Sequence, residues 1–555
     1  MKGYWLKCMG YGLLLAGIGL MCLLGSYFYF RIDLTEDQRY SLHAATKKLL
    51  GELEEEIYIE VYLDGDLPTG LKQLRRATQE LLEECKVYAH YPLRYQFVDV
   101  NKVPAAQKKG ILQQLVAKGI QPTNLYTQEK GQRTEKLIFP GALLTYKDRE
   151  GGVLLLKGNT MVSPAQMINQ SMEGLEYELA SAIEKLVRTQ RQQVALLRGH
   201  GEPDLRQLSG LTNALGAHYA VHTLDFSAKS VLAAYDALLI TGPQQPFSEA
   251  EKYLLDQYIM QGGKVLFFLD RLRINMENLR HQAAFAFPLD LGLDDQLFKY
   301  GVRINPDLVQ DLRAGVYPVV VGNLGNQPQL KLLPWPFFPL LNCFADHLVT
   351  KNMDMLYPQF ISSIDMIQAQ GVTHTPLVFT SQYSRRLGAP VHVDLEALRQ
   401  SPKPAHYNHG SIPLAYLLEG NFTSCYKHRC LPVGFEPATF LPASPPTKLL
   451  VVASSSMVCN SIDPRSKQPL PWGYDPFLQR QFANKDFVLN TLAYMLHEDG
   501  LLNLKQKTLQ VRLLDHVRLA QERFWWQLMN LILPLLLLGL LGAVWNYLYR
   551  RAYKS

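Results

Sequence analysis

The sequence is poor in cysteine, with 7 among 555 residues. Two of them, Cys8 and Cys22, lie in an apolar segment near the N-terminus, and the others are scattered along the chain. No two have the Cys-x-x-Cys spacing that is typical of zinc sites and redox centres. The spacing predicts no disulfide framework, although a single bond between Cys425 and Cys430 stays open.

The sequence also lacks a strong charge bias and a phosphate-binding loop. The net charge is +6, and Lys and Arg are spread through the chain, so a nucleic-acid partner is not indicated. No Gly-x4-Gly-Lys-Ser/Thr motif occurs, so the chain is not a P-loop ATPase. The length exceeds what one hydrophobic core supports, so two or three globular domains are expected.

Charge is missing altogether from two segments, residues 8–30 and 527–549. Each is long enough to cross a bilayer as a helix, at about 1.5 Å of rise per residue. Lysines precede the first segment and Arg550 and Arg551 follow the second, which predicts cytoplasmic termini. Neither segment carries an intramembrane charge, and two spans are too few for a permease pathway.

These segments divide the chain into five predicted parts. An N-terminal tail and anchor occupy residues 1–30, and a C-terminal helix and tail occupy residues 527–555. Residues 501–526 form a membrane-proximal strand and helix. The two parts between, residues 31–191 and 192–500, are expected to be folded domains on the far side of the membrane.

Residues 31–191 have the element order β-α-β-α-β-β-α, which predicts a thioredoxin-like domain. The first strand is Ile57 to Leu63, and a hairpin is expected around Lys147 to Gly152. No cysteine follows the first strand, where the sequence is LDGDLP. The domain is therefore expected to bind or to support structure, without redox chemistry.

Residues 192–500 alternate strands and helices, which predicts an α/β domain with a parallel sheet. Strands are expected at Val194–Leu197, Ala237–Ile240 and Val265–Leu269, with a helix at Leu205–Leu215. Ser248 and Glu251 have the spacing of a capping box at the start of another helix.

Gly199-His200-Gly201-Glu202 directly follows the first strand of this parallel sheet. Ligands of such folds bind at the carboxyl ends of strands, where the strand order reverses, so His200, Gly201 and Glu202 are a candidate ligand or partner site. An amidotransferase-like enzyme would also need a nucleophile on a tight turn, and no Cys or Ser occupies the candidate turns. The structural alternative is that Glu202 caps the next helix and His200 satisfies loop carbonyls.

A second candidate is the aromatic stretch PWPFFP, residues 334–339. Its prolines exclude a regular helix or a central strand. The stretch is expected to present Trp335, Phe337 and Phe338 on a rigid loop, as a partner contact or as a plug between domains. His218 and His222 have zinc-like i, i+4 spacing but no intervening Glu, so no metal and no cofactor are predicted.

The order of several motifs gives a family resemblance over nearly the whole chain. RIDLTEDQRYSLHAATKKLL, FPGALLTY, LLRGHGE, LLEGNFTSCYKHR, NKDFVLNTLAYML and LQVRLLD resemble, in this order, the GldG family. The middle part is similar to the domain that intraflagellar-transport proteins share with class I glutamine amidotransferases, a flavodoxin-like fold. One departure concerns the strand at residues 448–453: in the family it ends in acidic residues, and here it ends in Ser454-Ser455-Ser456.

The resemblance implies a membrane-anchored auxiliary subunit of an ABC transporter, associated with gliding motility in Bacteroidetes. Such a subunit would be non-catalytic and would lie in the bacterial inner membrane with the bulk of the chain in the periplasm. Its partners would be a separate ABC permease and ATPase, together with an envelope protein or polysaccharide. The alternatives are a degenerate amidotransferase-like enzyme and an envelope scaffold that works without a transporter.

Overall fold

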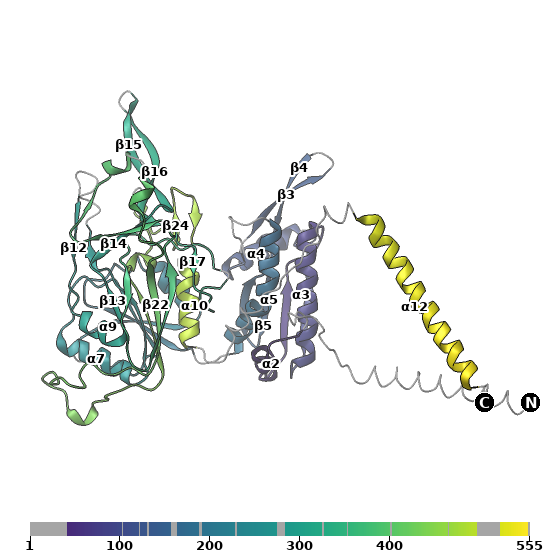
Figure 1. Cartoon of the computed structure of the whole chain (residues 1–555), viewed down its shortest axis with the longest axis horizontal. Helices are drawn as coiled ribbons and strands as arrows, with labels where there is room; N and C mark the ends of the chain where they lie inside the picture. Colours follow the sequence, from purple (N-terminus) through teal and green to yellow (C-terminus); the bar gives the residue numbers. More distant parts are fainter. Residues whose placement is uncertain are drawn as a thin grey trace, which may run out of the picture. The chain divides into compact units, whose positions relative to one another are not determined.

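A computed structural model describes residues 41–496 and 522–552, apart from 101, 103, 121, 130–131, 157–163, 188–190, 228–229, 275–283, 325–326, 352, 400–401 and 464–465. The predicted first membrane span and the predicted strand at residues 504–514 lie outside these described residues. The chain divides into two compact units, residues 1–507 and 508–555. The architecture is mixed α/β with several sheets and one apolar C-terminal helix (Figure 1).

The N-terminal part of the first unit is built on a four-stranded sheet. Its elements are α2 (Ala44–Gly51), β1 (Ile57–Val61), α3 (Thr69–Tyr88), β2 (Leu93–Phe97), α4 (Ala105–Ala117), β3 (Thr123–Glu129), β4 (Gln132–Ile138), β5 (Gly141–Tyr146), β6 (Arg149–Leu154) and α5 (Pro164–Val187). The sheet order is β2-β1-β5-β6, and β3 and β4 pair only with each other. β1 is parallel to β2 and antiparallel to β5.

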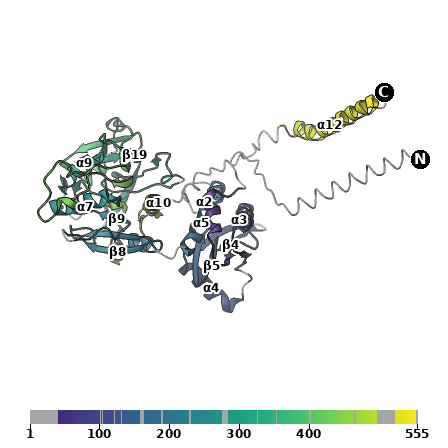
Figure 2. The ribbon, with the colours of Figure 1, turned by 90° about the horizontal axis from the view of Figure 1, so that it is seen from below.

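Two hydrophobic clusters hold this part together, one on each face of the sheet. Ile57, Ile59 and Val61 of β1 belong to the larger cluster, which contains residues of α3 and α5. The smaller cluster contains Leu115 of α4 and Leu143 of β5. Figure 2 shows α4 on the side of β5 away from α3 and α5. The predicted hairpin is present, but its turn is shorter, because Arg149 to Gly152 continue into β6.

The rest of the first unit is built on an eight-stranded sheet, with strand order β17-β19-β22-β23-β10-β9-β7-β8. Its strands are β7 (Gln193–Arg198), β8 (Ala220–Asp225), β9 (Ala237–Thr241), β10 (Lys264–Phe268), β17 (Cys343–Phe344), β19 (Val372–Phe379), β22 (Pro413–Gly420) and β23 (Thr447–Val452). Its helices are α6 (Ser209–Gly216), α7 (Glu249–Met260), α9 (Asp294–Tyr300) and α10 (Asn484–Leu496).

The prediction of a parallel sheet is correct only for five of these strands. β8, β7, β9, β10 and β23 are parallel, whereas β22, β19 and β17 extend the sheet in antiparallel pairing. The described residues between β19 and β22 contain no α-helix; their helical elements are two short 3₁₀ helices, η1 (Glu396–Arg399) and η2 (Pro404–His406). Parallel pairing needs a longer crossover, most often an α-helix, so strands without one return in the antiparallel direction.

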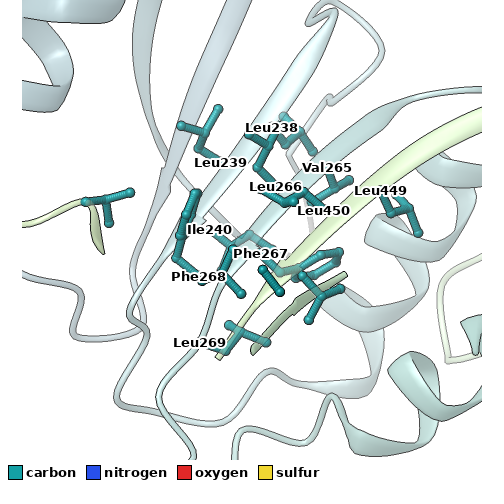
Figure 3. Packing of buried hydrophobic residues seen from close by; sticks show 14 of the residues in the cluster. Leu238, Leu239, Ile240, Val265, Leu266, Phe267, Phe268, Leu269, Leu449 and Leu450 are labelled. Carbon is teal, nitrogen blue, oxygen red and sulfur yellow. The ribbon is translucent and has the colours of Figure 1, made fainter. Parts of the chain in front are cut away.

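Continuous apolar runs explain why the central strands form. Every residue of β9 is buried, and Val265 to Phe268 of β10 are buried as well. Strands covered on both faces have this pattern in parallel sheets. Figure 3 shows the packed Leu, Ile, Val and Phe side chains of β9, β10 and β23. The predicted capping box is confirmed, because Ser248 and Glu251 each satisfy the other's backbone N–H at the start of α7.

A group of smaller sheets lies in the sequence between β10 and β22. Their strands are β11 (Leu272–Arg273), β12 (Ala284–Pro288), β13 (Val302–Ile304), β14 (Asp307–Asp311), β15 (Ala314–Leu324), β16 (Gln327–Pro339), β18 (Ile364–Met366), β20 (Ser384–Gly388) and β21 (Val391–Val393). The remaining short elements are η3 (Pro437–Thr439), η4 (Ser455–Met457), β24 (Tyr474–Asp475) and β25 (Arg480–Gln481). β11, β12 and β21 form one three-stranded sheet.

The second unit contains α12 (Arg523–Ala552), with Pro534 inside the helix. Residues 523–551 have a mean hydropathy of 2.2 over their most apolar stretch, and none of that stretch is buried. By length and composition this helix can cross a membrane. The exposed apolar side chains suit a lipid environment, so α12 indicates membrane anchoring.

Candidate functional site

The candidate site lies at the carboxyl edge of the eight-stranded sheet. β7 connects through α6 to β8 on one side, and β9 connects through α7 to β10 on the other. The strand order therefore reverses between β7 and β9, which is where ligands of open α/β sheets bind. The loop with His200, Gly201 and Glu202 leaves β7 at this position.

Glu202 closes the loop that carries it. Its Oε2 atom accepts hydrogen bonds from the backbone N–H groups of Gly199 and His200, both at 3.0 Å. Gly199 and Gly201 have φ values of +119° and +77°, a region that favours glycine. The prediction that Glu202 caps the next helix is wrong, because α6 begins only at Ser209 and has no side-chain cap.

Helix α6 begins four residues later than predicted, because the chain first forms irregular turns. Residues 205–208 form turns, and the N–H groups of Gln207 and Leu208 donate to the carbonyl of Asp204. The Asp204 N–H in turn donates to the Gln207 side chain at 3.1 Å. The bonds to the Asp204 carbonyl have the spacing of a helical turn, so the helix expected from Leu205 begins with an irregular turn and becomes regular only at Ser209.

The His200 side chain is buried and contacts the beginning of α7. Its ring stacks on Phe247, with ring centroids 4.0 Å apart. Its Nε2 atom lies 3.3 Å from Oε2 of Glu251, and its Nδ1 atom lies 3.8 Å from Oε1 of Glu202. The imidazole therefore lies between two carboxylates, one from the loop after β7 and one from the first turn of α7.

The His200 backbone also contacts the loop after β9. Its carbonyl accepts hydrogen bonds from the N–H groups of Gln244 at 2.7 Å and Gln245 at 2.9 Å. The expectation that His200 satisfies loop carbonyls is reversed, since its own carbonyl is the acceptor and its ring faces carboxylates. The residues of GHGE thus fix the loop after β7 to the loop after β9.

A third carboxylate of this edge, Asp270, was not predicted as a site residue. It follows β10, and it accepts hydrogen bonds from the backbone N–H of Ser455, at 2.8 Å, and from the Ser455 hydroxyl. Burial raises the pKa of the Asp270 carboxyl, although the two bonds from Ser455 act in the opposite direction. The sequence did hold a signal, because Asp270 directly follows the apolar run Val265–Leu269.

Gly242 brings Ser455 and the end of β9 into close contact. A Cβ atom at Gly242 would lie 2.6 Å from Cβ of Ser455, and the residue has a φ of +65°. Pro203 of the first loop would be 3.4 Å from the same atom. Side chains from three loops therefore fill this part of the edge.

The chemistry of the edge is that of a hydrogen-bonded closure. The hydroxyl of Ser455 donates to Asp270, and within the described ranges no group of three or more His, Cys, Asp or Glu side chains could hold a metal ion. In the described part of this edge, His200 Nδ1, Glu202 Oε1, Thr241 Oγ1 and Arg271 Nε are buried polar atoms with unused hydrogen-bonding capacity. Ligand binding by His200, Gly201 and Glu202 remains a prediction.

The prediction that residues 334–339 present their aromatic side chains on an exposed loop is wrong. Residues 334–339 end strand β16, and Trp335, Phe337 and Phe338 are each at most 4% exposed. They pack on one another and on Phe360, with centroids of Trp335 and Phe338 4.5 Å apart. Among the described strands β16 pairs only with β15, so prolines, which lack an N–H, are tolerated on its other side.

The histidine pair does not share a helix. His218 follows α6, and His222 lies in β8, where its Nε2 is 2.6 Å from Oε1 of Gln193. The i, i+4 spacing brings side chains together only within a helix.

These features define a class: a multidomain α/β protein with a large mixed sheet, a closed switch-point edge and a C-terminal apolar helix. Residues 191–491, more than half of the chain, match the model of a family described as an ABC-type uncharacterized transport system. The chain belongs to this ABC transporter auxiliary family. Residues 36–145 match a domain of unknown function.

Other comparisons are more distant. An uncharacterized protein of Borreliella burgdorferi is 23% identical over 424 residues, covering 72% of this chain and 75% of that protein. The N-terminal domain of mmIFT52 is 12% identical with a TM-score of 0.32, covering 56% of this chain and 99% of that one. A ThuA-like protein from Parabacteroides merdae is 10% identical with a TM-score of 0.27, covering 56% and 90%. Similarities this weak do not establish a shared fold.

Proposed function

We propose that this chain is a non-catalytic, membrane-anchored auxiliary subunit of an ABC transporter complex, of the kind that the GldG resemblance implies. The observation that carries the proposal is the family match over residues 191–491, joined in one chain to the apolar helix α12. An ATPase and a permease would be separate subunits, since the sequence has no P-loop.

The proposal includes a topology in the bacterial inner membrane. Both termini would lie in the cytoplasm and the bulk of the chain in the periplasm, because basic residues flank the outer ends of both charge-free segments. The folded parts would contact an envelope protein or polysaccharide, and α12 would pack on the permease.

The proposed fold names rest on strand order. The order β2-β1-β5-β6, with one parallel pair, supports a thioredoxin-like domain. The five parallel strands with a reversal between β7 and β9 support an amidotransferase-like domain.

The absence of catalysis is part of the proposal, and the closed carboxyl edge supports it. Glu202 is engaged by two backbone N–H groups, and Ser455 is engaged by Asp270. A nucleophile needs a neighbouring base within hydrogen-bond reach and room for a substrate. Here the Ser455 hydroxyl, which donates to Asp270, lies against Gly242, and the Ser248 hydroxyl is used in the cap of α7.

The test is co-purification from native membranes in mild detergent, with a C-terminal tag on the full chain. We expect an ABC ATPase and a multi-span permease in fixed ratio. As a matched variant, residues 527–549 are exchanged for an unrelated apolar helix of equal length. Loss of the permease from that variant supports packing on α12. Recovery of envelope proteins alone, without transporter subunits, would overturn the proposal in favour of a scaffold.

The enzymatic alternative is separated from the transporter role by His200→Gln. A catalytic His200 would make this variant inactive in the cell while the complex still assembles. We expect the variant to retain both the complex and its activity. An assembled but inactive complex would contradict the non-catalytic assignment.

A further inference from the structure

Strand β12 buries its small residues and exposes its large ones. Ala284 and Ala286 are 6% and 0% exposed, whereas Phe285 and Phe287 are 52% and 58% exposed. Burial of a phenylalanine side chain stabilises a protein, so the fold forgoes this gain twice in one short strand. Two neighbouring exposed aromatic side chains are a feature that packing does not explain.

Neighbouring strands extend the feature across the sheet. In the register of the three-stranded sheet, Arg273 of β11 is opposite Phe287, and His392 of β21 is opposite Phe285. The ring centroids of the two phenylalanines are 6.3 Å apart, and those of Phe285 and His392 are 5.1 Å apart. Since opposite residues share a sheet face, these four side chains form one exposed surface, called here the β12 face.

Arg273 gives the β12 face an unneutralised charge. Its Nη2 atom donates to the carbonyl of Gln244 at 2.7 Å, and no carboxylate of the described chain lies within ion-pair distance. Arg271, two residues earlier, has its carboxylate partner in Asp294 at 2.6 Å. The Arg273 guanidinium is therefore held in place by one carbonyl and keeps its other N–H groups free.

We propose that the β12 face docks on a protein partner whose surface presents an apolar patch next to an Asp or Glu side chain. Phenylalanine and arginine are enriched at the centres of protein interfaces. An exposed guanidinium beside apolar rings is complementary to a carboxylate, with which it forms paired, charge-assisted hydrogen bonds. The surface would act in this way whether or not the chain serves a transporter.

The test places a photo-crosslinking amino acid, p-benzoyl-phenylalanine, at position 287 of the full chain in native membranes. The control position is Val231, which is 72% exposed and lies far along the sequence from β12. We expect a protein adduct from position 287 and not from position 231, with the crosslinked partner peptide lying beside an Asp or Glu. Adducts only with a second copy of this chain, with lipid or with glycan would overturn the proposal, as would no adduct.

Charge reversal sharpens the test. Arg273→Glu is expected to lower the adduct yield at least about tenfold, and reversing the partner's acidic residue is expected to restore it. Arg303→Glu, at an exposed position of β13, is the matched control and leaves the yield unchanged. Phe285→Ala should retain normal thermal unfolding while it lowers the yield. An adduct that is insensitive to Arg273→Glu would contradict the acidic partner.

Discussion

The carboxyl edge of the eight-stranded sheet and the β12 face treat their side chains in opposite ways. At the edge, residues of types that often act in catalysis are buried and hydrogen-bonded within the fold. Glu202 accepts hydrogen bonds from two backbone N–H groups, and Asp270 accepts one from the backbone N–H of Ser455. On the β12 face, residues that would stabilise a core are left in solvent. A side chain's type therefore identifies a site less well than whether the fold already buries it or bonds it.

A substitution in the core beneath the carboxyl edge and a matched one on the β12 face should differ most in their effect on the free energy of unfolding. Phe268 of β10 is fully buried, so Phe268→Ala is expected to lower the free energy of unfolding by about 3–5 kcal/mol. The matched change on the other surface, Phe287→Ala, should alter it by about 0.5 kcal/mol or less. Urea unfolding followed by circular dichroism measures both. Equal losses for the two variants would show that the β12 face is packed.

The close contact between Gly242 and Ser455 should give the next largest effect. Gly242→Ala forces a Cβ to within 2.6 Å of Ser455 at a positive φ, so we expect a loss of about 2–4 kcal/mol. Gly388→Ala is the control, because nothing lies within 4 Å of its added Cβ. A Gly242→Ala protein as stable as Gly388→Ala would mean that the edge has room for a ligand. Thermal unfolding of the purified chain distinguishes the two outcomes.

Removal of the Glu202 carboxylate should have a smaller effect. Glu202→Ala leaves the N–H groups of Gly199 and His200 without their acceptor, which is expected to cost about 1–3 kcal/mol. Hydrogen exchange of these two amides should accelerate, while Glu55→Ala, at an exposed position, leaves them unchanged. Unaltered exchange in Glu202→Ala would show that the carboxylate is free to serve another purpose.

The smallest effect is a pH dependence from Asp270. Burial raises its pKa in the folded protein above the unfolded value, so its contribution to stability is full at low pH. That contribution is lost as pH rises through the folded pKa, by about 1.4 kcal/mol for each pH unit between the two pKa values. Asp270→Asn keeps hydrogen-bonding groups for Ser455 but does not titrate. Its stability relative to the wild type should therefore increase with pH above about 4 in a denaturation series.

A flat difference between Asp270→Asn and the wild type from pH 4 to 8 would contradict the raised pKa. Glu55→Gln provides the exposed control in the same series. A difference of opposite sign would indicate that the folded protein lowers the pKa of Asp270, which would also contradict the prediction.

Local sequence patterns were sufficient to predict most elements of the four-stranded and eight-stranded sheets. The apolar runs at Val194–Leu197, Ala237–Ile240 and Val265–Leu269 are β7, β9 and β10 within one residue at either end. Ser248 and Glu251 form the predicted capping box. These features depend on neighbours in the sequence, so they can be inferred without the fold.

Other predictions depended on partners distant in sequence and were wrong or incomplete. The aromatic residues at 334–339 were expected on a loop, because prolines disfavour strands, yet the hairpin with β15 provides an edge where prolines fit. Asp270 was overlooked because its partner Ser455 is 185 positions away. The outward Phe and inward Ala of β12 have the alternation of any strand, and the pattern does not say which face is covered.

The order of motifs in the sequence indicated an ABC transporter auxiliary family. Local patterns also predicted the helix that can enter a membrane and the positions of the central strands. These follow from composition and from short-range periodicity, which act within a single segment. The tertiary structure was needed to show that Glu202 of GHGE closes its own loop and that Trp335 lies in a hydrophobic core. It was also needed to show that Phe285 and Phe287 face solvent. The physical reason is that burial and hydrogen bonding depend on which distant segments meet, and a linear pattern does not contain that information.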